Sequence, residues 1–262
     1  MKKILYYFKI WLIISKNSFL NVIHQRLALA IFLVGKILRF VFFLAFLYFI
    51  VNSAGTLAGY SSHQAIFFFL TFNLIDIVSQ FLFRDVYRFR PLVASGDFDL
   101  ILVKPLNALF RVLMGGADFI DLVTIPPVIY ALIWLGQSLN PSYFQVLMYI
   151  FLILNGLLIA TSFHIAVLAL GIITLEIDHT IMIYRDLMSL GRFPIDIYKE
   201  PLKGILTYLI PVGIMISLPT KALLGLVSPI GLFISFAVGV TVFVISLKLW
   251  DFALTKYTSA SS

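Results

Sequence analysis

Cysteine is absent from this chain of 262 residues, and only 12% of the residues are charged. Without cysteine there are no disulfides and no thiolate metal sites, although this says nothing about the compartment. The sequence also contains no G-x-x-x-x-G-K-[ST] phosphate loop, no H-E-x-x-H motif and no G-x-S-x-G turn. The four histidines are far apart, at positions 24, 63, 164 and 179. We therefore expect no catalytic site, no metal site and no ATP site of the usual kind in this chain.

Hydrophobic residues make up 61% of the chain, and 26 of them are phenylalanines. Soluble domains average ~45–50% apolar and ~25% charged residues. An apolar excess of this size does not fit inside one soluble core, because the surface area does not shrink to match. The net charge of +7 comes from basic residues that flank apolar segments, which favours binding to anionic lipid heads over nucleic acid. The sequence predicts an all-α membrane protein, with a single transmembrane domain over residues 1–262.

A membrane helix needs about 20 mostly apolar residues. Five windows meet this requirement, at residues 27–51, 64–83, 109–135, 143–173 and 226–249. Before them, residues 4–19 carry Lys9 and Lys16, while apolar or small residues recur at helical spacing at Leu5, Phe8, Leu12, Ser15 and Phe19. This pattern predicts a helix within residues 1–25 that lies in the membrane interface rather than crossing the bilayer. The alternative is a poorly hydrophobic extra span.

The segment from Glu176 to Lys203 is too charged for a lipid-facing helix, yet residues 180–190 carry apolar side chains at helical spacing. Two arrangements fit. In the first, the segment is a long loop, and residues 204–219 form the fifth span. In the second, residues 177–193 form a fifth helix shielded by protein, and residues 201–224 re-enter from outside, broken at Pro211 and Pro219. Either arrangement predicts six transmembrane helices.

Basic residues alternate between the connections. They precede the first window and lie between the second and third, at Lys2, Lys3, Lys9, Lys16, Arg26, Arg84, Arg88, Arg90, Lys104 and Arg111. The loops after the first and third windows contain neither lysine nor arginine. Because cytoplasmic loops carry the excess of basic residues, this pattern predicts cytoplasmic N- and C-termini for a multi-pass protein of the cell membrane.

The charged residues that lie well inside the apolar windows include Lys36, Arg39, Asp76, Asp118 and Asp121. A charge at membrane depth is a functional hypothesis by default. The acids would line a pathway or carry protons, or they would pair with Lys36 or Arg39 and neutralise a helix contact. We favour pairing for Asp76 and leave both hypotheses open for the other two, which share a helix face.

The connection from Arg84 to Lys104 is short and charged, and Pro91 and Pro105 bracket a segment that predicts a short helix. It is either a topological stop with solvated charges or a docking element for a soluble partner.

Three stretches carry a family pattern. The first is Gly59-Tyr60-Ser61, just before an apolar helix. The second and most specific is ASGDFDLILVKPL at residues 94–106, which matches G-x-[FL]-D-x-x-L-x-[RK]-P-L. The third is GRFPIDIY at residues 191–198, followed by Pro211 and Pro219. Over nearly the whole chain, these stretches resemble membrane subunits of ABC transporters of the type-2 exporter class, within a family of short permeases that have no ATPase domain of their own.

The resemblance implies a permease subunit that forms half of a translocation pathway. Two permeases, alike or different, would pair with two copies of a cytoplasmic ABC ATPase, which would bind ATP and Mg while this chain holds no cofactor. Residues 84–107 would be the cytoplasmic coupling segment, and residues 194–224 an external re-entrant gate containing Pro194, Pro211 and Pro219. The residues expected to contact the ATPase are Arg84, Asp85, Arg88, Arg90, Gly96, Asp97, Asp99, Lys104 and Pro105.

The competing hypothesis is an ion-coupled secondary transporter that uses Asp76, Asp118 and Asp121. Such transporters are commonly built from internal repeats. No convincing repeat is visible in this sequence, so the permease hypothesis leads.

Overall fold

The structure, a computed structural model, describes residues 2–174 and 177–258, and every element of regular structure in these ranges is a helix. Helices α2 (Arg26–Ala54), α7 (Phe119–Ser138), α8 (Tyr143–Thr174) and α12 (Pro229–Lys256) are each long and apolar enough to cross a membrane. So is α3 (Ser62–Phe83) together with its continuation to Ala94. A bent pair, Leu202–Leu209 and Gly213–Leu223, makes a sixth candidate if it counts as one span. The all-α membrane fold predicted from the sequence is confirmed.

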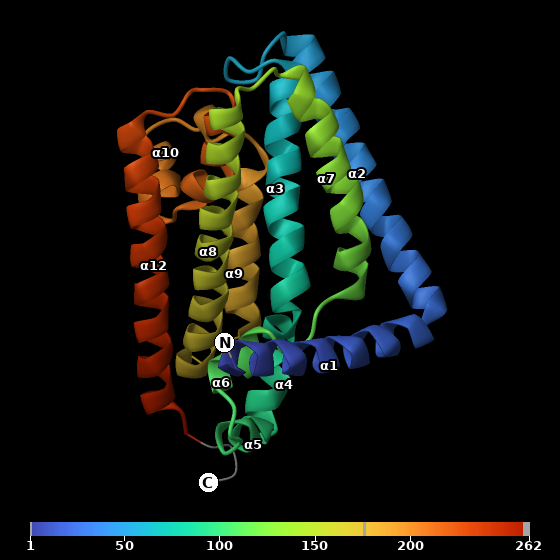
Figure 1. Ribbon diagram of the computed structural model, residues 1–262, viewed down its shortest axis with the longest axis vertical. Helices are drawn as coiled ribbons and strands as arrows, with labels where there is room; N and C mark the ends of the chain where they lie inside the picture. Colours follow the sequence, from blue (N-terminus) through green and yellow to red (C-terminus); the bar gives the residue numbers. More distant parts are fainter. Residues whose placement is uncertain (1, 175–176, 259–262) are drawn as a thin grey trace.

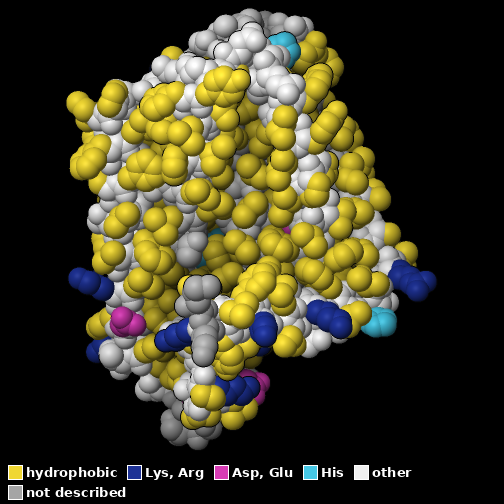
Figure 2. Space-filling view, viewed as in Figure 1, with side chains coloured by type: hydrophobic (Ala, Val, Ile, Leu, Met, Phe, Trp, Pro, Cys, Tyr) yellow, Lys and Arg dark blue, Asp and Glu magenta, His cyan; other side chains and the backbone are white. Residues whose placement is uncertain are grey.

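The long helices run side by side, with α1 (Lys2–His24) lying crosswise at one end of the bundle (Figure 1). The same end carries α4 (Phe89–Ala94), α5 (Asp97–Leu102), α6 (Ala108–Leu113) and the C-terminal end of α12, and we call it the α5 end. The opposite end, with α10 (Leu202–Gly204), is called the α10 end. Hydrophobic side chains cover the body, while the lysines and arginines visible in Figure 2 gather toward the α5 end.

Helix α8 is central and packs closely against α12, α11 (Leu218–Leu223) and α9 (Ile177–Ser189). Small residues permit these contacts, as is usual between membrane helices. A Cβ on Gly239 of α12 would lie only 2.1 Å from Oδ1 of Asn155 on α8, and one on Gly171 of α8 only 2.6 Å from Cγ1 of Ile177 on α9. Helix α2, by contrast, lies at the edge, and only Leu47 and Val51 of its side chains are buried.

The third predicted span, residues 109–135, is wrong at its start. The chain forms α6, breaks, and begins α7 only at Phe119. The carboxylate of Asp118 explains the boundary, because it accepts hydrogen bonds from the Ile120 and Asp121 amides and caps the helix. At the break, the space that a Cβ on Gly115 would need is filled by the side chains of Asp85 and Arg111.

The ambiguous region forms a helix rather than a loop. Helix α9 buries a stripe at helical spacing, Ile177, Ile181, Tyr184 and Met188, against α8. It ends at Ser189, earlier than the predicted Phe193, and continues as the 3₁₀ helix η2 (Leu190–Arg192). In Figure 1 α9 runs back alongside α8 from the α5 end. The helix therefore agrees with the second arrangement and begins at the predicted residue, Ile177. Glu176, the first residue of the ambiguous segment, lies outside the described residues.

The segment after α9 lies at the α10 end (Figure 1). It comprises the 3₁₀ helix η3 (Ile195–Ile197), α10, the π-helices η4 (Ile205–Leu209) and η5 (Gly213–Ser217), and α11. Its two halves meet at an angle of 78° across a break that contains Pro211. Proline removes a helical hydrogen bond and its ring clashes with the preceding turn, which accounts for the bend.

Helix α1 presents two different faces. Tyr7, Trp11, Ser15 and Phe19 recur every fourth residue and contact the bundle: the three rings meet Phe110, Phe81 and Phe119, and Ser15 accepts a hydrogen bond from the Ala117 amide. Leu5, Phe8 and Leu12 of the predicted stripe are exposed instead. The predicted apolar face thus divides, with Ser15 and Phe19 facing protein and the rest facing away from it.

Candidate functional site

The charges predicted at membrane depth meet between α2, α3 and α7. The ammonium group of Lys36 pairs with Asp121 of α7 and also donates a hydrogen bond of 3.0 Å to Thr124. Both side chains of the pair are largely buried, Lys36 with 22% and Asp121 with 7% of its side chain exposed. This contact is the one that the pairing hypothesis names for Asp121, and two opposite charges at this depth stabilise each other.

Asp118 has a different partner from those considered in the sequence. Its carboxylate lies 3.1 Å from Nε of Arg84, at the end of α3, and does not pair with Lys36 or Arg39. Both aspartates and both of their basic partners line one cavity of about 560 Å³. One wall of this cavity is formed by residues of α2, Lys36 among them. The two acids predicted to share a face therefore do face the same space, and each is neutralised there.

Asp76 of α3 lies among arginines but pairs closely with none. It lines a small cavity of about 30 Å³ together with Arg39, Arg185 and Arg192, from α2, α9 and η2. Within the described ranges, no ion pair within 4 Å joins Asp76 to any of these three arginines. Asp76 therefore lies near these arginines without the ion pair to Lys36 or Arg39 that the pairing hypothesis names. Arg185 and Arg192 are not among the site residues predicted from the sequence. Their position in a segment whose apolar residues recur at helical spacing could have indicated that they lie at membrane depth.

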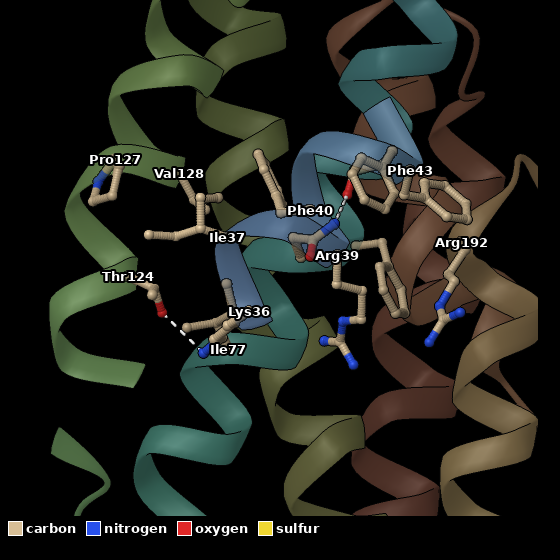
Figure 3. Close-up of a pocket in the computed structure, with 13 residues that line it drawn as sticks. Lys36, Ile37, Arg39, Phe40, Phe43, Ile77, Thr124, Pro127, Val128 and Arg192 are labelled. Carbon is tan, nitrogen blue, oxygen red and sulfur yellow. Dashed lines mark hydrogen bonds between the residues drawn. The ribbon is translucent and has the colours of Figure 1, made fainter. Parts of the chain in front are cut away.

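A second cavity, of about 300 Å³, lies beside these charges (Figure 3). Its walls are aromatic and aliphatic, and its cations are Lys36, Arg39 and Arg192. Arg39 and Arg192 extend in the same direction past the rings in Figure 3. The guanidinium carbon of Arg192 is 5.9 Å from the ring centroids of both Phe43 and Phe72, within the range of cation–π attraction.

The predicted coupling segment, residues 84–107, forms a compact projection at the α5 end (Figure 1). It comprises the 3₁₀ helix η1 (Arg84–Arg88), α4 and α5. Gly96 joins α4 to α5 with a φ of +79°, a conformation that glycine adopts without strain. Phe98 is fully buried and meets the rings of Phe89 and Trp250, so the projection is anchored to the end of α12.

Most charges predicted to contact a partner also have internal contacts. Asp85 bonds Arg111 at 3.2 Å and lies 3.6 Å from Arg88. Arg90 of α4 bonds Asp178 of α9 at 2.6 Å, which ties the projection to α9.

The outer tip of the projection is exposed. Asp97 and Asp99 lie in the first turn of α5, where acids favour the helix dipole, and Lys104 and Pro105 follow the helix on the surface. Beside them, Leu100 and Val103 are 58% and 79% exposed, and the prediction from sequence did not include them.

The three gate prolines predicted from sequence, Pro194, Pro211 and Pro219, are buried at the α10 end. Next to Pro194, the carboxylate of Asp196 accepts hydrogen bonds from three elements: Tyr60 at 2.9 Å, Lys203 at 2.8 Å and Lys221 at 2.6 Å. Burial raises the pKa of Asp196, but the bonds from the two lysines outweigh it and lower the pKa to about 2. Asp196 belongs to the GRFPIDIY stretch, but it is not among the site residues predicted from the sequence.

No group of three or more His, Cys, Asp or Glu side chains among residues 2–174 and 177–258 has the arrangement needed to hold a metal ion. Comparison with curated proteins and with solved structures gives no match for the chain. Residues 36–261 match the family model described as ABC-2 family transporter protein. This match covers most of the chain and agrees with the several long apolar helices and with the family pattern at residues 94–106. The chain therefore belongs to the ABC-2 family of transporter membrane proteins and is a multi-pass membrane protein.

Proposed function

We propose that this chain is the permease subunit of an ATP-driven exporter, moved by a separate cytoplasmic ABC ATPase. The observation that carries the proposal is the projection formed by α4 and α5. Its inner face is anchored by Phe98, while Leu100 and Val103 stand exposed at its tip beside Lys104. Apolar side chains presented on a charged, water-facing projection fit a groove on a soluble partner.

The α5 end would face the cytoplasm. The basic residues gather toward this end (Figure 2), and basic residues are retained on the cytoplasmic side of membranes. Both α1 and the end of α12 lie there (Figure 1), so this orientation would put both termini on the cytoplasmic side. Helix α1 would lie in the interface, with Leu5, Phe8 and Leu12 toward lipid and the Tyr7 face toward the bundle.

Movement of the ATPase would reach the charged cavities through α9. Arg90 connects α4 to Asp178 at the start of α9. The same helix carries Arg185, and η2 after it carries Arg192 into the cavity of Figure 3. A displacement of α4 along this path would therefore shift the cavity arginines, which is the coupling between sites that ATP-driven transport requires.

The bent pair at the α10 end would act as the outer gate. The Asp196 cluster joins Tyr60, from the loop after α2, to Lys203 and Lys221 of the two halves of the pair. Breaking these bonds would free the pair from the α2–α3 loop. A second permease, identical or homologous, would complete the pathway beside α2, whose side chains are mostly exposed in this chain.

The ion-coupled alternative has less support. It needs acids that bind and release a coupling ion, but Asp121 and Asp118 are each paired with a basic residue. The third acid, Asp76, shares its cavity with three arginines, which disfavour a bound cation.

The test is co-purification of the tagged permease from membranes, with bound proteins identified by mass spectrometry. We expect an ABC ATPase to co-purify and the complex to hydrolyse ATP in a vanadate-sensitive manner. Leu100→Asp and Val103→Asp should each abolish co-purification. Leu226→Asp is the matched control, because Leu226 is 60% exposed, close to the 58% of Leu100, and precedes α12 at the α10 end. Transport that persists without ATP and stops with an uncoupler would refute the proposal.

A further inference from the structure

The cavity of Figure 3 combines two properties that are seldom found together at membrane depth. Its wall contains four phenylalanines, Phe40, Phe43, Phe69 and Phe72. Its charged side chains are Lys36, Arg39 and Arg192, and it has no acidic residue in its lining. Its volume of about 300 Å³ lies at the lower end of the range of small-molecule pockets.

The charges around the cavity do not balance. Lys36 and Arg84 are each paired with an aspartate. Three arginines, Arg39, Arg185 and Arg192, are then left with Asp76 alone among the residues that line the three adjoining cavities. Three positive charges against one leave an excess of two. Because a cation at membrane depth costs about 2.5–3.5 kcal/mol to insert, an excess of this kind is a functional feature rather than a packing detail.

The arginine geometry suits an anion. The guanidinium of Arg192 lies 5.9 Å from the ring centroids of both Phe43 and Phe72, and its side chain points the same way as that of Arg39 (Figure 3). Within the part of the chain that the structure describes, neither guanidinium has a carboxylate within 4 Å, so their donors remain available to a ligand. A guanidinium binds carboxylate, sulfate and phosphate oxygens through two parallel hydrogen bonds.

We propose that this cavity binds an amphipathic anion, with its acidic head on Arg39 and Arg192 and its apolar body among the four phenylalanines. The inference deepens the proposed function, since it names the substrate class of the permease. Asp76 lines the adjoining small cavity together with these arginines and would serve as their counter-charge when no anion is bound. Such a ligand comes either from the membrane, as an anionic lipid, or from solution, as a free aromatic or aliphatic acid.

The binding test uses the purified permease alone, in nanodiscs of phosphatidylcholine, titrated with 2-naphthalenesulfonate by calorimetry. 2-Naphthyltrimethylammonium, with the same ring and the opposite charge, is the matched ligand control. We expect the sulfonate to bind and the ammonium compound not to bind. Arg39→Gln and Arg192→Gln should each weaken sulfonate binding by about tenfold or more, the effect of losing a charge-assisted hydrogen bond.

Three further variants make the result specific. Arg26→Gln, in the same helix as Arg39 but outside the lining of these cavities, should bind like the wild type. Arg39→Lys should retain part of the affinity, which shows that charge rather than folding is lost in Arg39→Gln. Asp76→Asn should bind the sulfonate at least as tightly as the wild type, because the competing carboxylate is gone. Equal binding of the ammonium compound, or loss of binding in Asp76→Asn, would overturn the proposal.

The source of the ligand is resolved by competition. Phosphatidylglycerol added to the nanodiscs should displace the sulfonate if the ligand is a membrane lipid, and should leave it bound if the ligand is a free acid. Either outcome supports the anionic chemistry, whereas absence of sulfonate binding in both nanodiscs overturns it. This assay contains no ATPase, so its failure is separate from failure of the co-purification test of the proposed function.

Discussion

The pair between Lys36 and Asp121 is the most direct test of how this bundle tolerates charge at membrane depth. The two residues are 85 positions apart, on α2 and α7, and both are largely buried. We predict that Lys36→Met and Asp121→Asn each destabilise the fold, and that the double variant is more stable than the sum of the two losses implies. The reason is that each single variant leaves one charge without its partner.

The magnitude follows from two independent scales. Removing one member of a buried ion pair costs about 3–5 kcal/mol, because the remaining charge is uncompensated. Placing a single charge at the centre of a membrane helix costs about 2.5–3.5 kcal/mol. The 22% exposure of Lys36 places Lys36→Met at the lower end of this range, about 3 kcal/mol, even though the variant also loses the hydrogen bond to Thr124. With both charges replaced, the coupling energy should be about 2 kcal/mol.

The assay is equilibrium unfolding in mixed micelles, followed by tryptophan fluorescence, for the wild type, both single variants and the double variant. Lys248→Met is the control, because Lys248 is exposed on α12 and makes no ion pair within the described part of the chain. It should change the unfolding free energy by less than about 0.5 kcal/mol. Additive losses in the double variant, with a coupling energy near zero, would show that the pair does not join α2 to α7.

Three more predictions concern the two ends of the bundle. Gly96→Ala should lower the unfolding free energy by about 1–2 kcal/mol, because Gly96 has a φ of +79°, which strains alanine. Gly35→Ala is the control: a Cβ there meets nothing within 4 Å, so this change within α2 should raise the unfolding free energy slightly. Thermal unfolding of the two variants measures these changes. Asp196 has a pKa lowered from 3.8 to about 2, so its contribution to stability is fully present above pH 4 and should be lost as the pH falls from about 4 to 2. Asp196→Asn should remove that pH dependence in unfolding experiments. Replacing Asp99 and Lys104 together should leave membrane insertion intact but uncouple ATP hydrolysis from transport in vesicles; normal transport would contradict their place at the ATPase contact.

Much of this architecture was readable from local sequence. Windows of about 20 apolar residues marked three of the five long helices to within three residues at each end, and the start of α12 equally closely, because only a helix satisfies its own backbone groups in lipid. The all-α class, the crosswise N-terminal segment and the charged projection after α3 follow from composition and from where lysine and arginine interrupt the apolar runs. The family resemblance at residues 94–106 also depends on local sequence, since Gly96 must stand where the chain turns between two short helices.

Tertiary structure alone decided which charges meet. Asp121 pairs with Lys36 and Asp118 pairs with Arg84. Nothing in the sequence alone distinguishes these pairs from the reverse pairing. The break before α7 arose because Asp118 caps a new helix rather than lying within a longer one. Arg192 joins Arg39 in one cavity only because α9 runs back along α8 and brings η2 to α2. Apolar periodicity is a local property that can be recognised in the sequence. The partner of a buried charge, in contrast, depends on how helices far apart in the chain pack together.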